Sequence, residues 1–256
     1  MDSVESAPEH GDFLSSVATR APAARLGVEV VRALVTAIVT GDVAPGDLLP
    51  PEGVLSQRFG VSRTVIRESV KRLEEKGLVT VAQGRGTEVS PATSWNVLDP
   101  VVLSALIDND DSLGVLDELS VVRAGLEASM ASATARARTA EQLDRLRAIL
   151  ERMQAGVDES DDSFRQADID FHLLVMDLSG NRLAQSIAKI LFRRALESTR
   201  YHGVDQEDAL QQTLREHERI FDAIAAGDAD GASTEMQRHI ADAWERRRLP
   251  IHPRSS

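Results

Sequence analysis

The chain has 256 residues, a formal net charge of −12 and no cysteine. Without cysteine it can form neither a disulfide nor a thiolate metal site, so any bound metal must be held by histidine and carboxylate side chains. No run approaches the roughly 18 uncharged apolar residues of a membrane span, and residues 1–19 lack the basic residues of a secretory leader. The sequence therefore predicts a cytoplasmic protein with no membrane partner.

The net charge is divided unevenly along the chain. Residues 1–19 carry four acidic side chains and no basic one, which is typical of a disordered acidic arm. Residues 58–86 hold seven basic and three acidic residues, a net of +4, whereas residues 91–256 hold 19 basic and 29 acidic residues. A whole-chain charge of −12 argues against a nucleic-acid partner, but a basic module in front of an acidic one does not.

The first module, residues 20–90, is predicted to be helical with a β-hairpin at its end. Apolar residues at helical spacing, good helix starts and glycine-containing breaks define its elements. In chain order we expect a helix over 26–40, a helix over 51–60, a helix from the N-cap Ser62 to Lys76, and strands over 78–82 and 87–90 around the tight loop 83–86.

After residue 90 the strand signals vanish. Residues 91–112 are predicted to be a linker with a connecting helix, and residues 113–248 an all-helical antiparallel bundle. Its expected helices are 113–136, 140–155, 162–179, 182–201, 207–226 and 229–247. The fold class is therefore mainly α, with a winged helix-turn-helix followed by a helical bundle.

The short link before Ser62 is typical of a helix-turn-helix, whose second helix enters the DNA major groove. Ser62, Arg63 and Thr64 lie in the first turn of that helix, and Arg67 follows Arg63 by four residues on the same face. Arginine can grip a guanine or a phosphate with two hydrogen bonds. An arginine-rich helix is often only a solvated face, but the hairpin that follows and the segregated charge favour DNA binding.

The predicted hairpin tip also suits DNA. Arg85 stands between Gly84 and Gly86, so the backbone at the tip could approach a minor groove or a phosphate closely.

Several separated blocks of this module resemble the winged-helix domain of GntR-type bacterial transcription regulators. They are Leu49-Pro-Pro-Glu52, residues 59–68, residues 73–78 and Gly84-Arg85-Gly86. The resemblance implies a homodimer on a short palindromic operator, with Arg63, Thr64 and Arg67 at the operator and the hairpin tip in the minor groove. Gly53 stands where the family usually has a basic residue that contacts a DNA phosphate, so this chain lacks the side chain for that contact.

Four polar residues interrupt the apolar stripes of the predicted bundle. Asp168 and His172 are four residues apart and share a helix face, while His217 and His239 lie on inward positions of two other helices. One carboxylate and three neutral imidazoles would form a site for Zn²⁺, Ni²⁺, Mn²⁺ or Fe²⁺. For each histidine alone a hydrogen-bonded core position is the commoner explanation, and spacing does not determine whether the four converge.

The helical half resembles the FCD sensor domain of the FadR-like subfamily of GntR regulators. The matching stretches are residues 122–127, 168–172, 179–181, His217 with residues 223–228, and residues 236–239. In metal-binding members an Asp and three His at the positions of Asp168, His172, His217 and His239 hold a divalent cation. The resemblance also implies an organic-acid effector that reaches this metal, with Arg123 and Asn181 as effector contacts.

Residues 95–100 resemble the start of the sensor in sugar-acid-responsive members, so a sugar acid is one candidate effector. The resulting hypothesis is a ligand-responsive repressor without enzymatic activity. Three alternatives stay open: an acyl-CoA sensor that lacks the metal, a His/Asp metalloenzyme, and a helical interaction protein whose first module binds another protein. The four ligand positions argue against the first, and the basic module is unexplained by the second.

Overall fold

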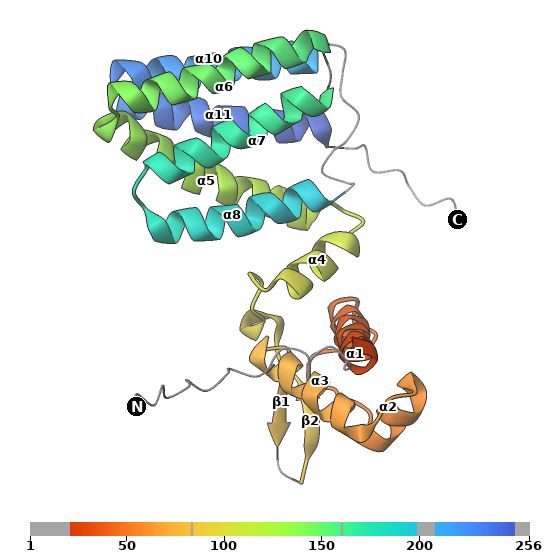
Figure 1. Ribbon diagram of the computed structural model, residues 1–256. Coiled ribbons are helices and arrows are strands. Elements are labelled where there is room, and N and C mark those ends of the chain that lie inside the picture. Colours follow the sequence, from red (N-terminus) through yellow and green to blue (C-terminus); the bar gives the residue numbers. More distant parts are fainter. Residues whose placement is uncertain (1–20, 83, 160, 199–207, 249–256) are drawn as a thin grey trace, which may run out of the picture. The chain divides into compact units, whose positions relative to one another are not determined.

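The computed structural model describes residues 21–82, 84–159, 161–198 and 208–248 (Figure 1). The chain divides into two compact units, Met1–Val102 and Leu103–Ser256. The mainly helical fold class is confirmed, with a winged helix-turn-helix before an all-helical part. The acidic arm predicted for residues 1–19 lies outside the described residues. Among the helices that are described, none combines the length and apolar character that a membrane crossing requires.

The first unit consists of three helices and a hairpin. Its elements are α1 (Ala21–Val39), α2 (Glu52–Phe59), α3 (Arg63–Glu75), β1 (Val79–Ala82), β2 (Gly86–Val89) and the 3₁₀ turn η1 (Ala92–Ser94). The link between α2 and α3 turns at Gly60, which has a φ of 65°, and the Ser62 hydroxyl oxygen accepts a hydrogen bond from the Val65 amide. The predicted N-cap is thus confirmed, and it fixes where α3 begins.

The core of this unit lies between α1, α3 and the start of the hairpin. Val35, Ile66, Leu73 and Leu78 are fully buried there. The two strands pair antiparallel from Val79 opposite Val89 to Ala82 opposite Gly86. A further extended segment pairs with β2 through Leu48, which the sequence pattern did not predict.

Gly77 joins α3 to β1 in a conformation that only glycine adopts freely. Its φ is +73°, and a Cβ there would lie 2.1 Å from the carbonyl oxygen of Ser94. We expect Gly77→Ala to lower the free energy of unfolding of this unit by about 3 kcal/mol, because left-handed strain and a backbone collision add together. Urea unfolding followed by circular dichroism measures the loss.

Gly84→Ala is the matched control for that variant. Gly84 has a similar φ of +77°, but no described atom lies within 4 Å of a Cβ built there. Only the conformational cost of about 1 kcal/mol is expected. Equal losses for the two alanine variants would contradict the packing of Ser94 against Gly77.

The second unit is entirely helical in its described residues. Its helices are α4 (Pro100–Asp108, which begins in the first unit), α5 (Gly114–Ala137), α6 (Ala140–Glu159), α7 (Asp161–Leu178), α8 (Arg182–Glu197), α10 (Ala209–Ala226) and α11 (Ala229–Arg247). Helix α5 packs against α7, α8, α10 and α11, and α6 packs against α7 and α10 (Figure 1). The main core lies among α5, α6, α7, α10 and α11. The predicted helix 182–201 ends earlier, at Glu197, because Ser198 has extended backbone.

Candidate functional site

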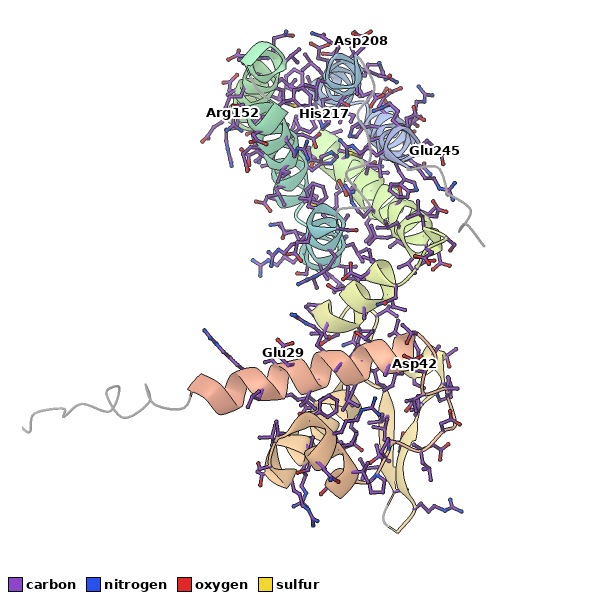
Figure 2. The ribbon with its side chains drawn as sticks, turned by 90° about the vertical axis from the view of Figure 1, so that its right-hand side faces the viewer. Glu29, Asp42, Arg152, Asp208, His217 and Glu245 are labelled. Carbon is purple, nitrogen blue, oxygen red and sulfur yellow. The ribbon has the colours of Figure 1, made fainter. Side chains whose placement is uncertain are left out.

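Four polar side chains from three helices meet inside the helical unit. Asp168 and His172 come from α7, His217 from α10 and His239 from α11; all four are buried, and each offers one ligand atom within 4.8 Å of the others. His217 lies in the interior of the bundle (Figure 2). The structure therefore brings together all four residues that the sequence proposed as ligands. We call them the Asp/His cluster.

The helical period explains why these side chains point inward. Asp168 and His172 are one turn apart on α7, and the fully buried Phe171 beside them belongs to the main core. His217 follows the buried Leu214 by one turn on α10, and His239 follows the buried Met236 on α11. The cluster thus occupies the inner faces of helices that apolar packing already holds in place.

Each histidine of the cluster hydrogen-bonds an acceptor through Nδ1. His172 donates to Glu127 Oε2 at 2.6 Å, His239 to a carboxylate oxygen of Glu216 at 2.8 Å, and His217 to the carbonyl oxygen of Thr213 at 2.8 Å. Because all three partners only accept, each Nδ1 carries a proton. In a neutral ring the other nitrogen, Nε2, offers a lone pair, and the Nε2 atoms of the three rings face one another inside the cluster.

The polar atoms in the middle of the cluster lie close together. The Nε2 atoms of His172 and His239 are 3.2 Å apart, and Asp168 Oδ1 is 3.2 Å from His217 Nε2. Asp168 Oδ1 and His217 Nε2 are also buried without a hydrogen-bond partner among the described residues. A buried polar atom left unpaired is costly, and four converging electron-pair donors are what a cation requires. The cluster therefore suggests a metal site, and its nitrogen and oxygen donors fit a divalent ion.

The charge states of the cluster fit this interpretation. Burial lowers the pKa of His239 to about 3, which keeps this ring neutral at physiological pH and able to act as a ligand. Burial alone would raise the pKa of Asp168. His217 and His172 beside it together have the larger effect and hold the pKa well below its usual value, so this carboxylate is ionised.

Two arginines stand behind the histidines, Arg123 buried and Arg246 partly buried. Arg123 pairs with Glu127 at 2.9 Å, with side chains only 2% and 1% exposed, and its guanidinium lies over the Phe192 ring at 4.4 Å. Burial alone would raise the pKa of Glu127, but Arg123 and His172 lower it to about 2. Arg123, predicted as an effector contact, is thus placed behind His172 and bound to Glu127.

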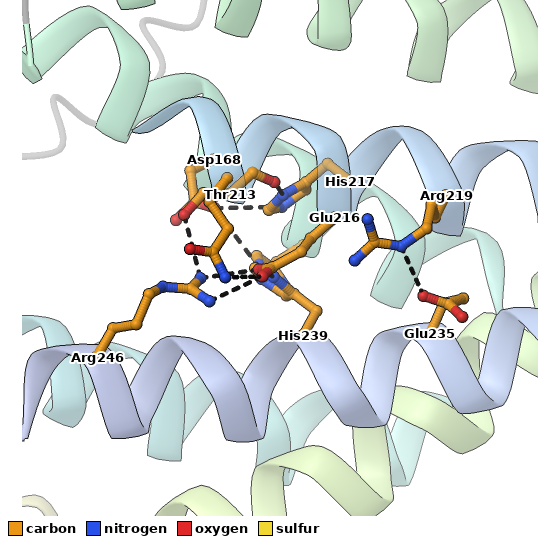
Figure 3. Close-up of polar contacts among 10 residues, drawn as sticks. Asp168, Thr213, Glu216, His217, Arg219, Glu235, His239 and Arg246 are labelled. Carbon is orange, nitrogen blue, oxygen red and sulfur yellow. Dashed lines mark hydrogen bonds and ion pairs between the residues drawn. The ribbon is translucent and has the colours of Figure 1, made fainter. Parts of the chain in front are cut away.

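Arg246 pairs with Glu216, the carboxylate that accepts from His239, as Arg123 pairs with Glu127. It pairs with both oxygens of Glu216 at 2.7 and 2.8 Å (Figure 3). Burial raises the pKa of Glu216, while the hydrogen bonds from His239 and Arg246 lower it to about 2. Such an Arg–Glu–His chain fixes both the tautomer and the orientation of the imidazole.

The remaining predicted effector contact lies elsewhere. Asn181 is exposed at the start of α8, where its side-chain oxygen accepts a hydrogen bond from the Ala184 amide at 3.1 Å. It contributes no atom to the Asp/His cluster.

The residues proposed for DNA binding lie on two exposed parts of the first unit. Ser62, Arg63, Thr64 and Arg67 are exposed at the beginning of α3. Gly84, Arg85 and Gly86 are exposed at the hairpin tip, and both glycines have positive φ values. Arg67 is joined to Glu52 at the beginning of α2, a contact that the spacing of residues did not indicate.

Sequence reasoning missed the residues that support the histidines: Glu127, Thr213, Glu216 and Arg246. A signal existed for Glu127, because it follows Arg123 by four residues on an otherwise small and apolar face of α5. Glu216 was not expected to face inward, because His217 next to it does and adjacent helical residues point about 100° apart.

Comparison with known families matches both units. A family model described as "Bacterial regulatory proteins, gntR family" matches residues 26–89, and a model described as "FCD domain" matches residues 118–242.

Relatives over most of the chain carry regulator names. The "Galactonate operon transcriptional repressor" of Escherichia coli (strain K12) is 34% identical over 82% of this chain and 91% of its own length. The "HTH-type transcriptional regulator LutR" of Bacillus subtilis (strain 168) is 30% identical over 80% of this chain and 93% of its own length. A "Putative L-lactate dehydrogenase operon regulatory protein" of E. coli is 29% identical over 85% of this chain and 84% of its own length.

One similar solved structure is that of Lar, described as controlling the agr system of Listeria monocytogenes. It has a TM-score of 0.54 at 18% identity and covers 86% of this chain and 95% of its own. At this identity the likeness supports the fold alone.

Proposed function

The chain belongs to the GntR family of bacterial regulatory proteins with a C-terminal FCD domain, and on this premise we propose that it is a metal-dependent, acid-responsive repressor. It is a DNA-binding transcriptional regulator and not an enzyme. In the proposed function it binds a palindromic operator as a homodimer, and a small organic acid bound in the helical unit changes its affinity for that operator.

A divalent metal is supported above all by the convergence of ligand atoms in the Asp/His cluster. The four ligand atoms lie within 4.8 Å of one another, and two of them, Asp168 Oδ1 and His217 Nε2, are buried without a hydrogen-bond partner among the described residues. Asp168, His172, His217 and His239 would hold the ion. When bound, it would supply a positive centre to which the carboxylate of an acid can coordinate. An acyl-CoA sensor without a metal would leave this cluster unexplained.

The charges around the cluster favour an anionic effector. The carboxylates of Asp168, Glu127 and Glu216 are balanced by three arginines: Arg123, Arg246 and Arg247, the last of which acts on Asp168. A divalent cation would then leave the site positive. A carboxylate would offset that charge, whereas a neutral sugar would leave it buried.

The names of two relatives support hydroxy acids as the class of effector. They refer to operons for galactonate and for L-lactate dehydrogenase, and both of these acids carry one carboxylate. The acid panel that we propose contains galactonate, L-lactate and succinate, with galactose as the neutral control. Stabilisation by galactonate or L-lactate but not by galactose, measured by thermal shift with and without a chelator, is the expected result.

Operator binding is assigned to the exposed face of α3 and the hairpin tip. We expect Arg63→Ala with Arg67→Ala to weaken binding to a selected operator by at least about 100-fold, because each bidentate arginine contact contributes about 1–3 kcal/mol. Fluorescence anisotropy at fixed salt measures the affinity.

Arg32→Ala with Arg72→Ala is the charge-matched control for that double variant. Both of these arginines are exposed, on α1 and on the last turn of α3. A loss of a few fold is expected from the removed charge alone. Equal weakening by the two double variants would contradict the assignment of α3 as the helix that reads bases.

A further inference from the structure

Arg67, on the proposed reading face of α3, is held by a carboxylate from the preceding helix. Its Nε lies 3.2 Å from Glu52 Oε1 and its terminal nitrogen 3.0 Å from Glu52 Oε2. The side chains are 71% and 40% exposed. The carboxylate thus covers one edge of the guanidinium, the edge formed by Nε and one terminal nitrogen, and leaves the outer edge open to solvent.

Arg63, one turn earlier, is in a different situation. It makes no hydrogen bond or ion pair with another described residue, and its guanidinium lies 3.5 Å from the position that a Cβ on Gly53 would occupy. The hydrogen bond from Arg67 lowers the pKa of Glu52, which is therefore ionised at neutral pH. The start of α2 therefore lies near both arginines but holds only Arg67 by hydrogen bonds.

The pair between Glu52 and Arg67 is not explained by stability. Exposed ion pairs add little to the free energy of folding because water screens them and two long side chains lose freedom. A carboxylate placed beside a DNA-reading arginine has another consequence. It limits the directions in which the guanidinium can point, and it repels a phosphate that approaches the same side.

We propose that Glu52 is a positioning residue that makes Arg67 a reader of guanine rather than a phosphate contact. The two terminal nitrogens on the outer edge of Arg67 match the O6 and N7 acceptors of guanine in the major groove. The covered edge and the nearby negative charge disfavour a phosphate at the same place. This inference rests on the proposed function, because it requires α3 to enter a major groove.

The test selects binding sites for the full chain from random duplex DNA and then measures affinities by anisotropy. In the wild-type site, 7-deazaguanine replaces each guanine in turn, which removes the N7 acceptor. We expect the replacement of one guanine per half-site to weaken binding by about tenfold or more. In Glu52→Gln the same replacement should weaken binding by no more than about threefold, and Arg67→Lys should behave in the same way.

Two further variants separate positioning from charge and from folding. Glu68→Gln, an exposed glutamate on α3, makes the same change in net charge and should keep the wild-type cost. Glu52→Asp keeps the negative charge at the start of α2 but is too short for the two-atom pairing, so it should behave as Glu52→Gln does. Circular dichroism melts confirm that each variant is folded.

The outcomes are distinguishable. If the wild-type chain selects no motif, the proposed function and this inference both fail. If it selects a motif and Glu52→Gln selects the same motif with an unchanged 7-deazaguanine cost, the inference alone fails. A uniform rise in affinity for all duplexes in Glu52→Gln, with the same base preference, would also overturn it, because it would mean that Glu52 acts only through its charge.

Discussion

The Glu127→Leu variant is expected to lose about 3–5 kcal/mol of unfolding free energy, the usual cost of breaking a buried ion pair from one side. Arg123 is 2% exposed, so its guanidinium cannot turn to water when its carboxylate is removed. His172 also loses the acceptor of its Nδ1 proton. Urea unfolding of the helical unit, followed by circular dichroism, measures the change.

The double variant Arg123→Met with Glu127→Leu is the control for this prediction. It removes both charges and fills their space with apolar atoms, so most of the lost stability should return. Metal affinity should stay about 10- to 100-fold below the wild-type value in the single and the double variant, because His172 has lost its orienting carboxylate in each. A single variant within 1 kcal/mol of wild type would show that Arg123 and Glu127 are not a buried pair in solution.

Removal of the metal is the second change with a large expected effect. A metal ion present at a thousand times its dissociation constant adds about 4 kcal/mol to the stability of the folded state. For a chain of this size, that corresponds to a fall of roughly 8–16 °C in melting temperature when a chelator is added. This stabilisation would arise because the metal gives a partner to two buried atoms that have none, Asp168 Oδ1 and His217 Nε2. Differential scanning calorimetry with metal-loaded and chelated protein measures it.

His217→Ala provides the internal control for metal removal. This variant lacks one of the four ligands, so its melting temperature should be nearly the same with metal and with chelator. The prediction is contradicted if wild-type protein melts within 1 °C in both conditions while elemental analysis confirms that the chelated sample has no metal.

The reading module was predictable because its signals are local. The short link at Gly60, the Ser62 cap and the tight hairpin at Gly84 each follow from neighbouring residues in the sequence. The extended segment at Leu48 was not predictable in this way. Its pairing with β2 joins residues 40 positions apart, which no periodicity records.

The Asp/His cluster was predictable only in part. Polar residues on apolar stripes indicated which four side chains point inward, and the family resemblance indicated that they converge. The residues that hold the histidines in place could be identified only from the structure. Glu216 and Arg246 are 30 residues apart and are of residue types that usually lie on solvated helix faces, yet they form a largely buried pair behind His239. Likewise, Arg123 was expected to face an effector, whereas in the structure it lies behind His172 and is bound to Glu127.

The same packing links the Asp/His cluster to α5. Arg123 holds Glu127, and Glu127 holds His172 on α7, so the cluster is connected to the helix that packs against four others. An acid can shift the protein between two arrangements only if it binds one of them better than the other.

The most direct test of this account is the operator affinity of the full chain, measured by anisotropy with each acid of the panel, for metal-loaded and for chelator-treated protein. At least one monocarboxylic acid is expected to change the affinity by about 5- to 150-fold when the metal is present, and to have no effect after chelation. An operator affinity that stays the same with every acid and in both metal states would contradict it.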